Sequence, residues 1–178
     1  MDIRPFCDKD LFQILEVYRK AFGGFPWYEE LSSQEILGRW NFQSTRPGFT
    51  CFIADLDGKI VGGIWWDRPT KESLLDERGE LLVSFIKGSH SDKDLVWERE
   101  LLVDPLHSRK GIATRLRMHF VEDVKRTLPC EQIVLTRMRD DNIPILRIAD
   151  KIGYQRTGIK MPCSIKPEVQ HEYWFLLV

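Results

Sequence analysis

The feature that most constrains the fold is a strand, a loop and a long amphipathic helix that follow one another in residues 95–128. Residues 95–103 are largely apolar and predict a strand. From Gly111 the pattern becomes helical, with apolar side chains recurring every four residues at Ile112, Leu116, Phe120, Val124 and Leu128. Pro129 predicts the end of this helix. A strand that feeds directly into such a helix is typical of a mixed α/β domain.

Three further segments before this unit predict helices. Residues 11–22 carry apolar side chains at helical spacing, and Ser32 followed by Glu35 has the spacing of a capping box that begins a second helix. Residues 70–93 are charged but also carry leucine, phenylalanine and isoleucine at helical spacing. We expect one amphipathic helix there, although Gly79 is unfavourable inside a helix.

The segments around these helices predict strands. A short apolar opening at 3–7 is the first. Residues 49–54 and 60–66 predict two strands joined by a turn at Asp57-Gly58.

After the long helix, residues 132–137 predict a strand. Asn142 then begins a helix that ends at Gly153, and two strands follow at 154–159 and 169–178. This order predicts one mixed α/β domain over residues 1–178, with no internal repeat and no linker.

Composition narrows the class of protein. The 178 residues are 43% hydrophobic and 30% charged, with a net charge of -1. That balance disfavours a partner such as nucleic acid or an anionic membrane. The four cysteines, Cys7, Cys51, Cys130 and Cys163, are scattered, which predicts neither a metal site nor a disulfide framework. The N-terminus lacks the apolar stretch of a signal peptide, so we expect a cytoplasmic protein.

The loop between the strand and the long helix carries the clearest chemical signal. It contains Ser108, Arg109, Lys110, Gly111, Ile112, Ala113 and Thr114. Backbone N–H groups at a helix start lack intrahelical partners, and the helix dipole adds positive charge there. The small residues allow a bulky anion to approach, and the two cations add charge. The segment therefore predicts a cradle for a pyrophosphate.

An isolated loop of this kind has a simpler explanation, in which Gly111 shapes the turn and the cations are solvated. The loop gives less support to a dinucleotide site or a nucleoside-triphosphate site. Neither the Gly-x-Gly-x-x-Gly pattern of dinucleotide sites nor a Gly-Lys-Ser/Thr loop is present.

The loop resembles the signature of the GNAT superfamily of acyl-CoA N-acyltransferases, which is Arg/Gln-x-x-Gly-x-Gly/Ala after a strand that ends in Val-x-Pro. This chain has Val103-Asp104-Pro105 and then Ser108 to Ala113. A second family segment, an Asn followed by a helix that ends in Gly-Phe or Gly-Tyr, is similar to Asn142 to Gly153-Tyr154. The order of elements also matches over nearly the whole chain.

The resemblance implies a central, mostly antiparallel mixed sheet flanked by helices, and an enzyme that moves an acetyl group from acetyl-CoA to an amine. It implies that the strand backbone at Leu101, Leu102 and Val103 binds the pantetheine arm, and that Asn142 belongs to the cofactor site. Two departures stand out. Ser108 occupies the usual Arg/Gln position, and Ala149 occupies the position of a tyrosine that protonates the departing thiolate in many members.

The reaction also requires a base, because an ammonium must lose a proton before it attacks. Glu98 and Glu100 alternate on one predicted strand, so we expect both on one face and take Glu100 as the first candidate and Glu98 as the second. A structural role, pairing with cations on a solvated sheet face, is the alternative. His107 and His119 are other candidate bases, with His119 expected to be a surface or packed side chain.

Trp27 and Tyr28, followed by Glu29 and Glu30, lie in the segment that borders the acceptor pocket in the family. Aromatic and acidic side chains suit an amine with an apolar body, but Trp27 could equally be a core residue. The acceptor stays open between a peptide N-terminus, a lysine, a polyamine, an aminoglycoside and another metabolite. Residues 70–93 fit either a lid over the pocket or the contact of a homodimer. A catalytically silent acyl-CoA-binding module is the alternative to an enzyme.

Overall fold

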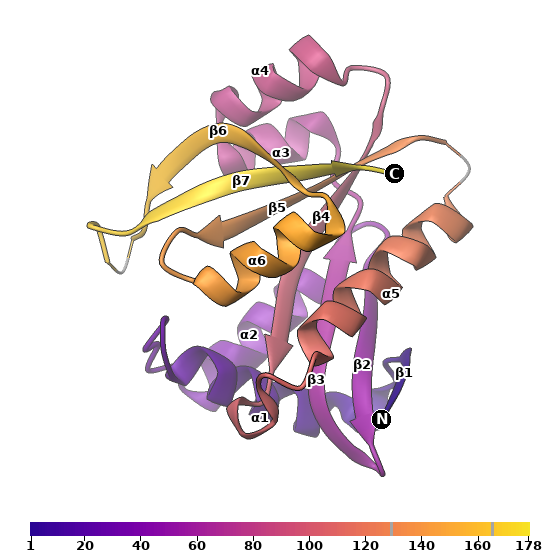
Figure 1. Cartoon of the computed structure of the whole chain (residues 1–178), viewed down its shortest axis with the longest axis vertical. Helices are drawn as coiled ribbons and strands as arrows, with labels where there is room; N and C mark the ends of the chain where they lie inside the picture. Colours follow the sequence, from indigo (N-terminus) through magenta and orange to yellow (C-terminus); the bar gives the residue numbers. More distant parts are fainter. Residues whose placement is uncertain (129, 165) are drawn as a thin grey trace. The chain divides into compact units, whose positions relative to one another are not determined.

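The computed structural model describes residues 1–128, 130–164 and 166–178. They form two compact units, Met1–Asp67 with Arg99–Asp123 and Arg68–Glu98 with Val124–Val178. The helices and strands of the two units are labelled in Figure 1. The boundary runs through the strand β4 (Asp94–Val103) and the helix α5 (Ile112–Thr127), so both elements contribute to both units. Pro129, the predicted end of the long helix, lies outside the described residues.

The first unit has the strand order β1-β2-β3-β4, and β1–β2 and β2–β3 pair antiparallel. Asp57 and Gly58 have φ angles of 53° and 85°, so both turn residues are left-handed, which suits a two-residue hairpin between β2 and β3. The predicted capping box is confirmed, since the Glu35 N–H donates to Ser32 Oγ and the Ser32 N–H donates to Glu35 Oε2. The elements of this unit besides β4 and α5 are β1 (Asp2–Pro5), η1 (Asp8–Asp10), α1 (Leu11–Gly23), α2 (Ser33–Ser44), β2 (Thr50–Leu56), β3 (Lys59–Asp67) and η2 (Pro105–His107).

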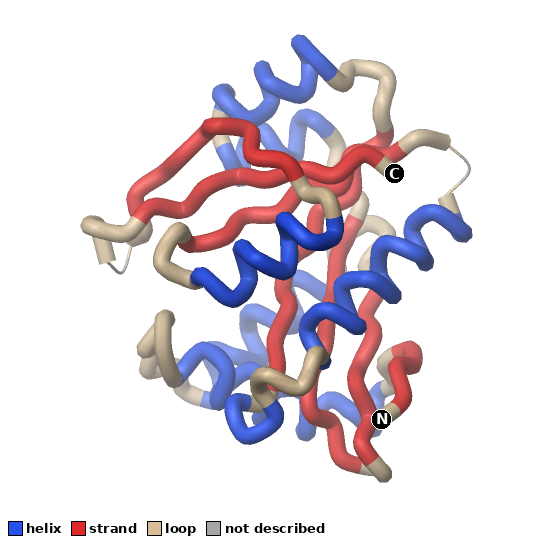
Figure 2. The backbone as a smooth tube through the Cα atoms, in the orientation of Figure 1, coloured by secondary structure: helices blue, strands red, loops and turns tan. Residues whose placement is uncertain are grey.

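Helices cover both faces of the β2–β3 hairpin in this unit (Figure 2). On one face α1 and α2 bury an apolar core against the strands and against Leu102 of β4. On the other face α5 packs through Phe120, whose ring centroid lies 4.6 Å from that of Trp66, and through His119, 4.5 Å from Phe52. His119 is therefore a packed side chain, as the sequence suggested.

The second unit has the strand order β4-β5-β7-β6. β4 and β5 pair in parallel, which requires a crossover connection such as α5, while β5–β7 and β6–β7 are antiparallel. The expected mostly antiparallel mixed sheet is thus confirmed. The elements of this unit besides β4 and α5 are α3 (Lys71–Arg78), α4 (Glu80–Ser89), β5 (Gln132–Arg139), α6 (Ile143–Ile152), β6 (Gln155–Pro162) and β7 (Gln170–Leu177).

The single helix predicted for 70–93 is wrong, because two helices, α3 and α4, occupy this segment. They separate at Gly79, whose φ of 83° is rarely adopted by residues with a side chain. The N–H of Gly79 still donates to the Leu75 carbonyl, which closes α3. The apolar face predicted for one helix is nevertheless kept by the pair, since Leu74, Leu82, Val83 and Ile86 are buried in a core with residues of β4, β5 and β7.

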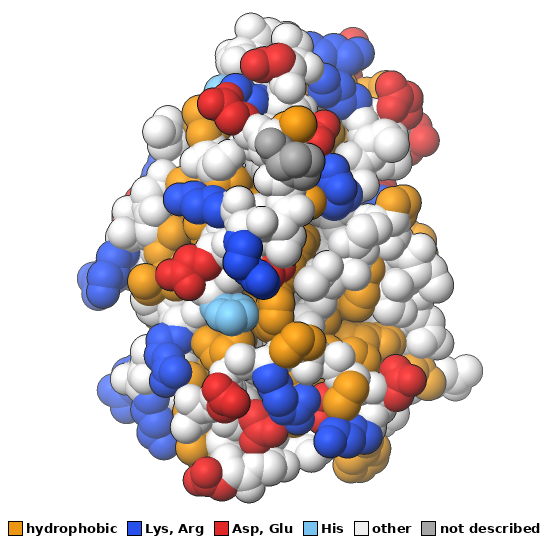
Figure 3. Space-filling view, turned by 90° about the vertical axis from the view of Figure 1, so that its right-hand side faces the viewer, with side chains coloured by type: hydrophobic (Ala, Val, Ile, Leu, Met, Phe, Trp, Pro, Cys, Tyr) orange, Lys and Arg blue, Asp and Glu red, His pale blue; other side chains and the backbone are white. Residues whose placement is uncertain are grey.

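No helix in the described part of the chain is long and apolar enough to cross a membrane. The surface shown in Figure 3 carries acidic and basic side chains interspersed, without a broad area of one charge on that face. The single domain over residues 1–178 stays a prediction.

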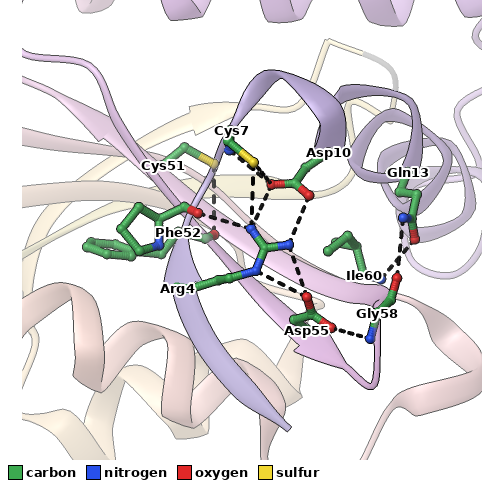
Figure 4. A network of polar contacts seen from close by, with 10 residues as sticks. Arg4, Cys7, Asp10, Gln13, Cys51, Phe52, Asp55, Gly58 and Ile60 are labelled. Atoms are coloured by element: carbon green, nitrogen blue, oxygen red, sulfur yellow. Dashed lines mark hydrogen bonds and ion pairs between the residues drawn. The ribbon is translucent and has the colours of Figure 1, made fainter.

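A partly buried ion-pair network fixes the start of the chain to the first unit (Figure 4). The Arg4 guanidinium of β1 donates to both carboxylate oxygens of Asp10, at 2.8 and 2.9 Å, and to Asp55 Oδ2 of β2. The backbone N–H of Cys7 also donates to Asp10. The Arg4 guanidinium holds the pKa of the buried Asp10 carboxyl well below its usual range.

We expect Asp10→Asn to lower the free energy of unfolding by about 1.5–3 kcal/mol at pH 7, the usual contribution of a hydrogen bond to a charged group. A carboxyl group with a depressed pKa stabilises the fold fully above its unfolded pKa of about 3.9. That contribution is lost as the pH falls toward the folded-state pKa. The difference between wild type and variant should therefore shrink on acidification, which denaturant titrations at several pH values would measure.

The matched control is Asp8→Asn, which changes the same charge at an exposed position of the same short helix. We expect it to have little effect on stability. A loss in Asp10→Asn that is the same at acidic and neutral pH would show that the ion pair is not its origin.

Candidate functional site

The loop after β4 begins at a buried anchor, Asp104. Its backbone N–H donates to the Val61 carbonyl of β3 at 2.9 Å. Its carboxylate accepts the Leu106 N–H at 2.9 Å and lies 3.4 Å from the Lys20 ammonium of α1. Burial raises the pKa of Asp104, but these donors outweigh it and hold the pKa below its usual value. The first residues of the loop are thus fixed to β3 and α1.

The following residues have backbone N–H groups without hydrogen-bond partners among the described residues. Arg109 and Gly111 both have left-handed backbones, with φ angles of 59° and 76°, on either side of Lys110. Such alternation makes a concave set of backbone donors that suits an anion. In the part of the chain that the structure describes, the N–H groups of residues 109–114 make no hydrogen bond, and the first intrahelical bond of α5 runs from Arg115 N to Gly111 O.

The loop is also open to a ligand. A side chain added at Gly111 would meet no atom within 4 Å. Ser108, Arg109 and Lys110 are exposed. Ile112 is buried and packs the start of α5 against β3 near Gly62. Ala113 and Thr114 are half-buried at the first turn. The sequence-predicted loop residues are therefore brought together at one helix N-terminus, where the dipole adds positive charge.

A close approach at Gly62 of β3 sets the position of that helix start. A Cβ at Gly62 would lie 2.9 Å from the Leu102 carbonyl oxygen and 3.2–3.3 Å from atoms of Leu116 and Ile112. No real side chain would fit these contacts without moving α5 or β4. The glycine thereby lets the first turn of α5 lie directly against the sheet, next to the end of β4.

The end of β4 carries the predicted backbone segment and one of the two predicted carboxylates. Leu102 is buried in the α1–α2 core, whereas Leu101 and Val103 are half-buried. Glu100 is half-buried, and its Oε1 accepts a hydrogen bond from Gln43 Nε2 of α2 at 3.2 Å. The indole N–H of Trp65 in turn donates to Gln43 Oε1 at 2.6 Å.

Tyr18 and Arg39 form a second group of polar side chains in the same part of this unit. The buried Tyr18 hydroxyl accepts a hydrogen bond from Arg39 Nη1 at 3.1 Å, and Arg39 also pairs with Glu29 at 2.7 Å. Burial raises the pKa of Tyr18, and the negative charge of Glu100 adds to that rise. Sequence reasoning missed Tyr18, Arg39 and Gln43, and the one available signal was a tyrosine among the apolar positions of α1.

The structure separates the two aromatic residues predicted for the acceptor side. Trp27 is half-buried, and its ring packs against Phe22 of α1 with 5.2 Å between centroids. Tyr28 is 62% exposed and has a left-handed backbone, with a φ of 52°. Of these two, only Tyr28 is an exposed side chain, and its ring lies edge-on to that of Phe25. Of the two acidic neighbours, Glu29 is engaged by Arg39 and Glu30 is exposed.

The second unit holds the other predicted site residues. Glu98 is 3% exposed, and its Oε2 accepts a hydrogen bond from the Tyr154 hydroxyl at 2.9 Å. Asn142 caps α6 through its backbone carbonyl, without a side-chain capping bond. Ala149 is completely buried on α6. Glu98 and Glu100 therefore have different hydrogen-bond partners, each within its own unit.

His107, another candidate base, lies in the loop after β4. His107 is half-buried in η2, and its Nδ1 is buried without a hydrogen-bond partner among the described residues. Within residues 1–128, 130–164 and 166–178, no three His, Cys, Asp or Glu side chains gather as a metal ion would require.

Known structures share this fold. A ribosomal-protein-alanine N-acetyltransferase from Brucella melitensis superposes with a TM-score of 0.73 at 14% identity, over 100% of both chains. An N-acetyltransferase from Staphylococcus aureus gives 0.71 at 16% identity, over 98% of this chain and 96% of that one. The protein yncA of Salmonella typhimurium, solved with its cofactor acetyl-CoA, gives 0.69 at 16% identity, over 99% and 92%.

Sequence comparison gives the family. No curated protein matches the chain significantly. The model of the acetyltransferase (GNAT) family matches residues 11–154, a segment that includes the loop, β4 and α6 and runs through both units. The chain therefore belongs to the GNAT family and is an acyltransferase that uses acetyl-CoA.

Proposed function

We propose that this enzyme transfers the acetyl group of acetyl-CoA to an amine by direct attack, with residues 108–114 binding the pyrophosphate and Glu100 acting as the base. The observation that carries the proposal is the set of backbone donors between Arg109 and Thr114 that have no hydrogen-bond partner among the described residues, beside an open Gly111. A doubly charged pyrophosphate satisfies such donors and is favoured by the helix dipole and two cations.

The rest of the cofactor site follows the strand and α6. In this proposal the backbone of Leu101, Leu102 and Val103 binds the pantetheine arm, and Asn142 belongs to the same site. When bound, acetyl-CoA supplies a thioester whose carbonyl carbon is open to attack by an amine. Backbone donors beside that carbonyl stabilise the negative charge that develops on its oxygen.

Glu100 is the better placed of the two carboxylates for proton transfer. Its half-buried side chain lies beside Tyr18 of α1 and Gln43 of α2. These two helices flank the segment with Trp27 and Tyr28. A carboxylate there attracts a cationic amine and accepts its proton before attack. Glu98 is more deeply buried and already accepts the Tyr154 hydroxyl.

The departing sulfur needs no proton donor at Ala149 in this proposal. Ala149 is completely buried, and a much larger side chain at a buried position generally overpacks its surroundings. A thiol has a pKa of about 8.5, and its anion is therefore a tolerable leaving group near neutral pH. The acceptor is an amine with an apolar body that Trp27 and Tyr28 border, in a cytoplasmic setting.

A pair of Gly111 variants tests the pyrophosphate site. Asp and Asn both tolerate a left-handed backbone, and the open space at Gly111 accommodates either. Gly111→Asp should raise the Kd for acetyl-CoA about tenfold to a hundredfold over Gly111→Asn, because like charges then meet at close range. Calorimetric titration measures both. Equal affinities of the two folded variants for acetyl-CoA would show that this loop does not bind the pyrophosphate.

The base is tested by Glu100→Gln, which keeps the shape and can still accept the Gln43 hydrogen bond. We expect kcat/KM to fall about 10²–10⁴-fold, the range for a positioned acid–base group. Affinity for acetyl-CoA should hardly change. The assay is release of free thiol from acetyl-CoA with a panel of amines, over a range of pH.

The wild-type rate should rise with pH through one ionisation, and the variant should need a more alkaline solution or a less basic amine. Glu98→Gln is the comparison, since it removes the other carboxylate of the strand. Full activity and an unaltered pH profile in Glu100→Gln would show that Glu100 is not the base, and Glu98 would be the next candidate.

A further inference from the structure

A chain of hydrogen bonds joins the core of the first unit to Glu100. It starts at the indole N–H of Trp65 in β3, passes through the Gln43 amide of α2 and ends at the Glu100 carboxylate of β4. Trp65 is 1% exposed and packs against Trp40 and Tyr18 in the α1–α2 core, so its indole is held in place. Three separate elements therefore meet at one amide group.

The chemistry of these groups fixes the orientation of the Gln43 amide. An indole N–H can only donate, so the amide oxygen must face Trp65. The amide NH₂ must then face Glu100, and the atom of Glu100 that it meets must be an acceptor. The amide thus presents a donor to Glu100 in one orientation, and turning it over would place two donors together at Trp65.

Titratable and charged side chains of α1, of α2 and of the segment between them also lie in this part of the unit. Tyr18 of α1 is close enough for the Glu100 charge to raise the pKa of its hydroxyl. That hydroxyl is held by Arg39 of α2, which also binds Glu29. Arg39 is engaged by two partners, and Gln43 donates directly to the Glu100 carboxylate at 3.2 Å.

We propose that Gln43 is a positioning residue for the reaction. Its amide, locked by Trp65, orients the Glu100 carboxylate and favours the ionised form that accepts the proton of the acceptor amine. A donor that is already held in place stabilises an anion without a cost of reorganisation at the moment of reaction. This inference rests on the proposed role of Glu100 as the base.

The test is Gln43→Glu, which keeps the length of the side chain and an oxygen for the Trp65 indole but replaces the donor at Glu100 by an acceptor. Two carboxylates that face each other cannot both ionise easily. The midpoint of the acidic limb of the kcat/KM profile should move to higher pH. Below the wild-type midpoint, activity should fall about tenfold for each pH unit of that shift.

A second readout does not depend on an amine substrate. With ¹³C-labelled glutamate, the side-chain carboxyl signal that disappears in Glu100→Gln identifies Glu100, and its pH titration can be followed in the free protein. We expect its midpoint to rise in Gln43→Glu and, to a smaller extent, in Gln43→Met, which removes the donor without adding charge. Gln34→Glu is the control, since it adds the same charge at an exposed position of α2.

The double variants separate this inference from the proposed base. If Gln43 acts through Glu100, Gln43→Glu should lower activity in the wild-type background and have no further effect in Glu100→Gln. Loss of activity in Glu100→Gln together with an unshifted Glu100 titration in Gln43→Glu overturns the role of Gln43 and leaves the base intact. Full activity of Glu100→Gln overturns the base, and the role of Gln43 in catalysis with it.

Discussion

The start of an α-helix leaves backbone N–H groups without partners, and this chain places such a start directly against a sheet. The contact depends on Gly62, where any Cβ would lie within 3 Å of the Leu102 carbonyl oxygen. Because β3 has no side chain there, Ile112 and Leu116 pack down onto the strand and α5 begins at the end of β4. The backbone donors of residues 109–114 and the backbone of residues 101–103 consequently belong to one compact region of the first unit.

In the same unit, Glu100 of β4 is contacted by the helices on the opposite face of the sheet from α5. Helices α1 and α2 bury Tyr18, Trp40 and Trp65 together, and the polar ends of these aromatic residues need hydrogen-bond partners. Gln43 satisfies the Trp65 indole and Arg39 satisfies the Tyr18 hydroxyl. Packing of the core therefore places polar groups beside Glu100, so that requirements of stability and of the proposed proton transfer are met by the same side chains.

The second unit uses its polar residues differently. Tyr154 follows the αL glycine that ends α6, and its hydroxyl donates to the buried Glu98. A phenylalanine at this position would preserve the ring but leave a buried carboxylate without that donor, which is costly. Glu98 thus has a structural explanation within its own unit, which is the reason for preferring Glu100 as the base.

The sequence by itself determined the elements whose signals are local. Apolar spacing, the Ser32–Glu35 capping box, Asp57-Gly58 and Gly153 gave the order of helices and strands, and the small residues from Gly111 identified the helix start and the family. One helix was predicted at 70–93 because the periodicity continues through Gly79, whereas the left-handed backbone there breaks it.

Tertiary structure alone decided the surroundings of the site residues. The contact between Gln43 and Glu100 joins residues 57 positions apart, and the one between Tyr154 and Glu98 joins residues 56 apart. Trp27 and Tyr28 are adjacent, yet one ring packs against α1 while the other faces solvent. Periodicity specifies which face of an element is buried. It does not specify which polar group of another element will meet it, because that depends on how the buried side chains pack.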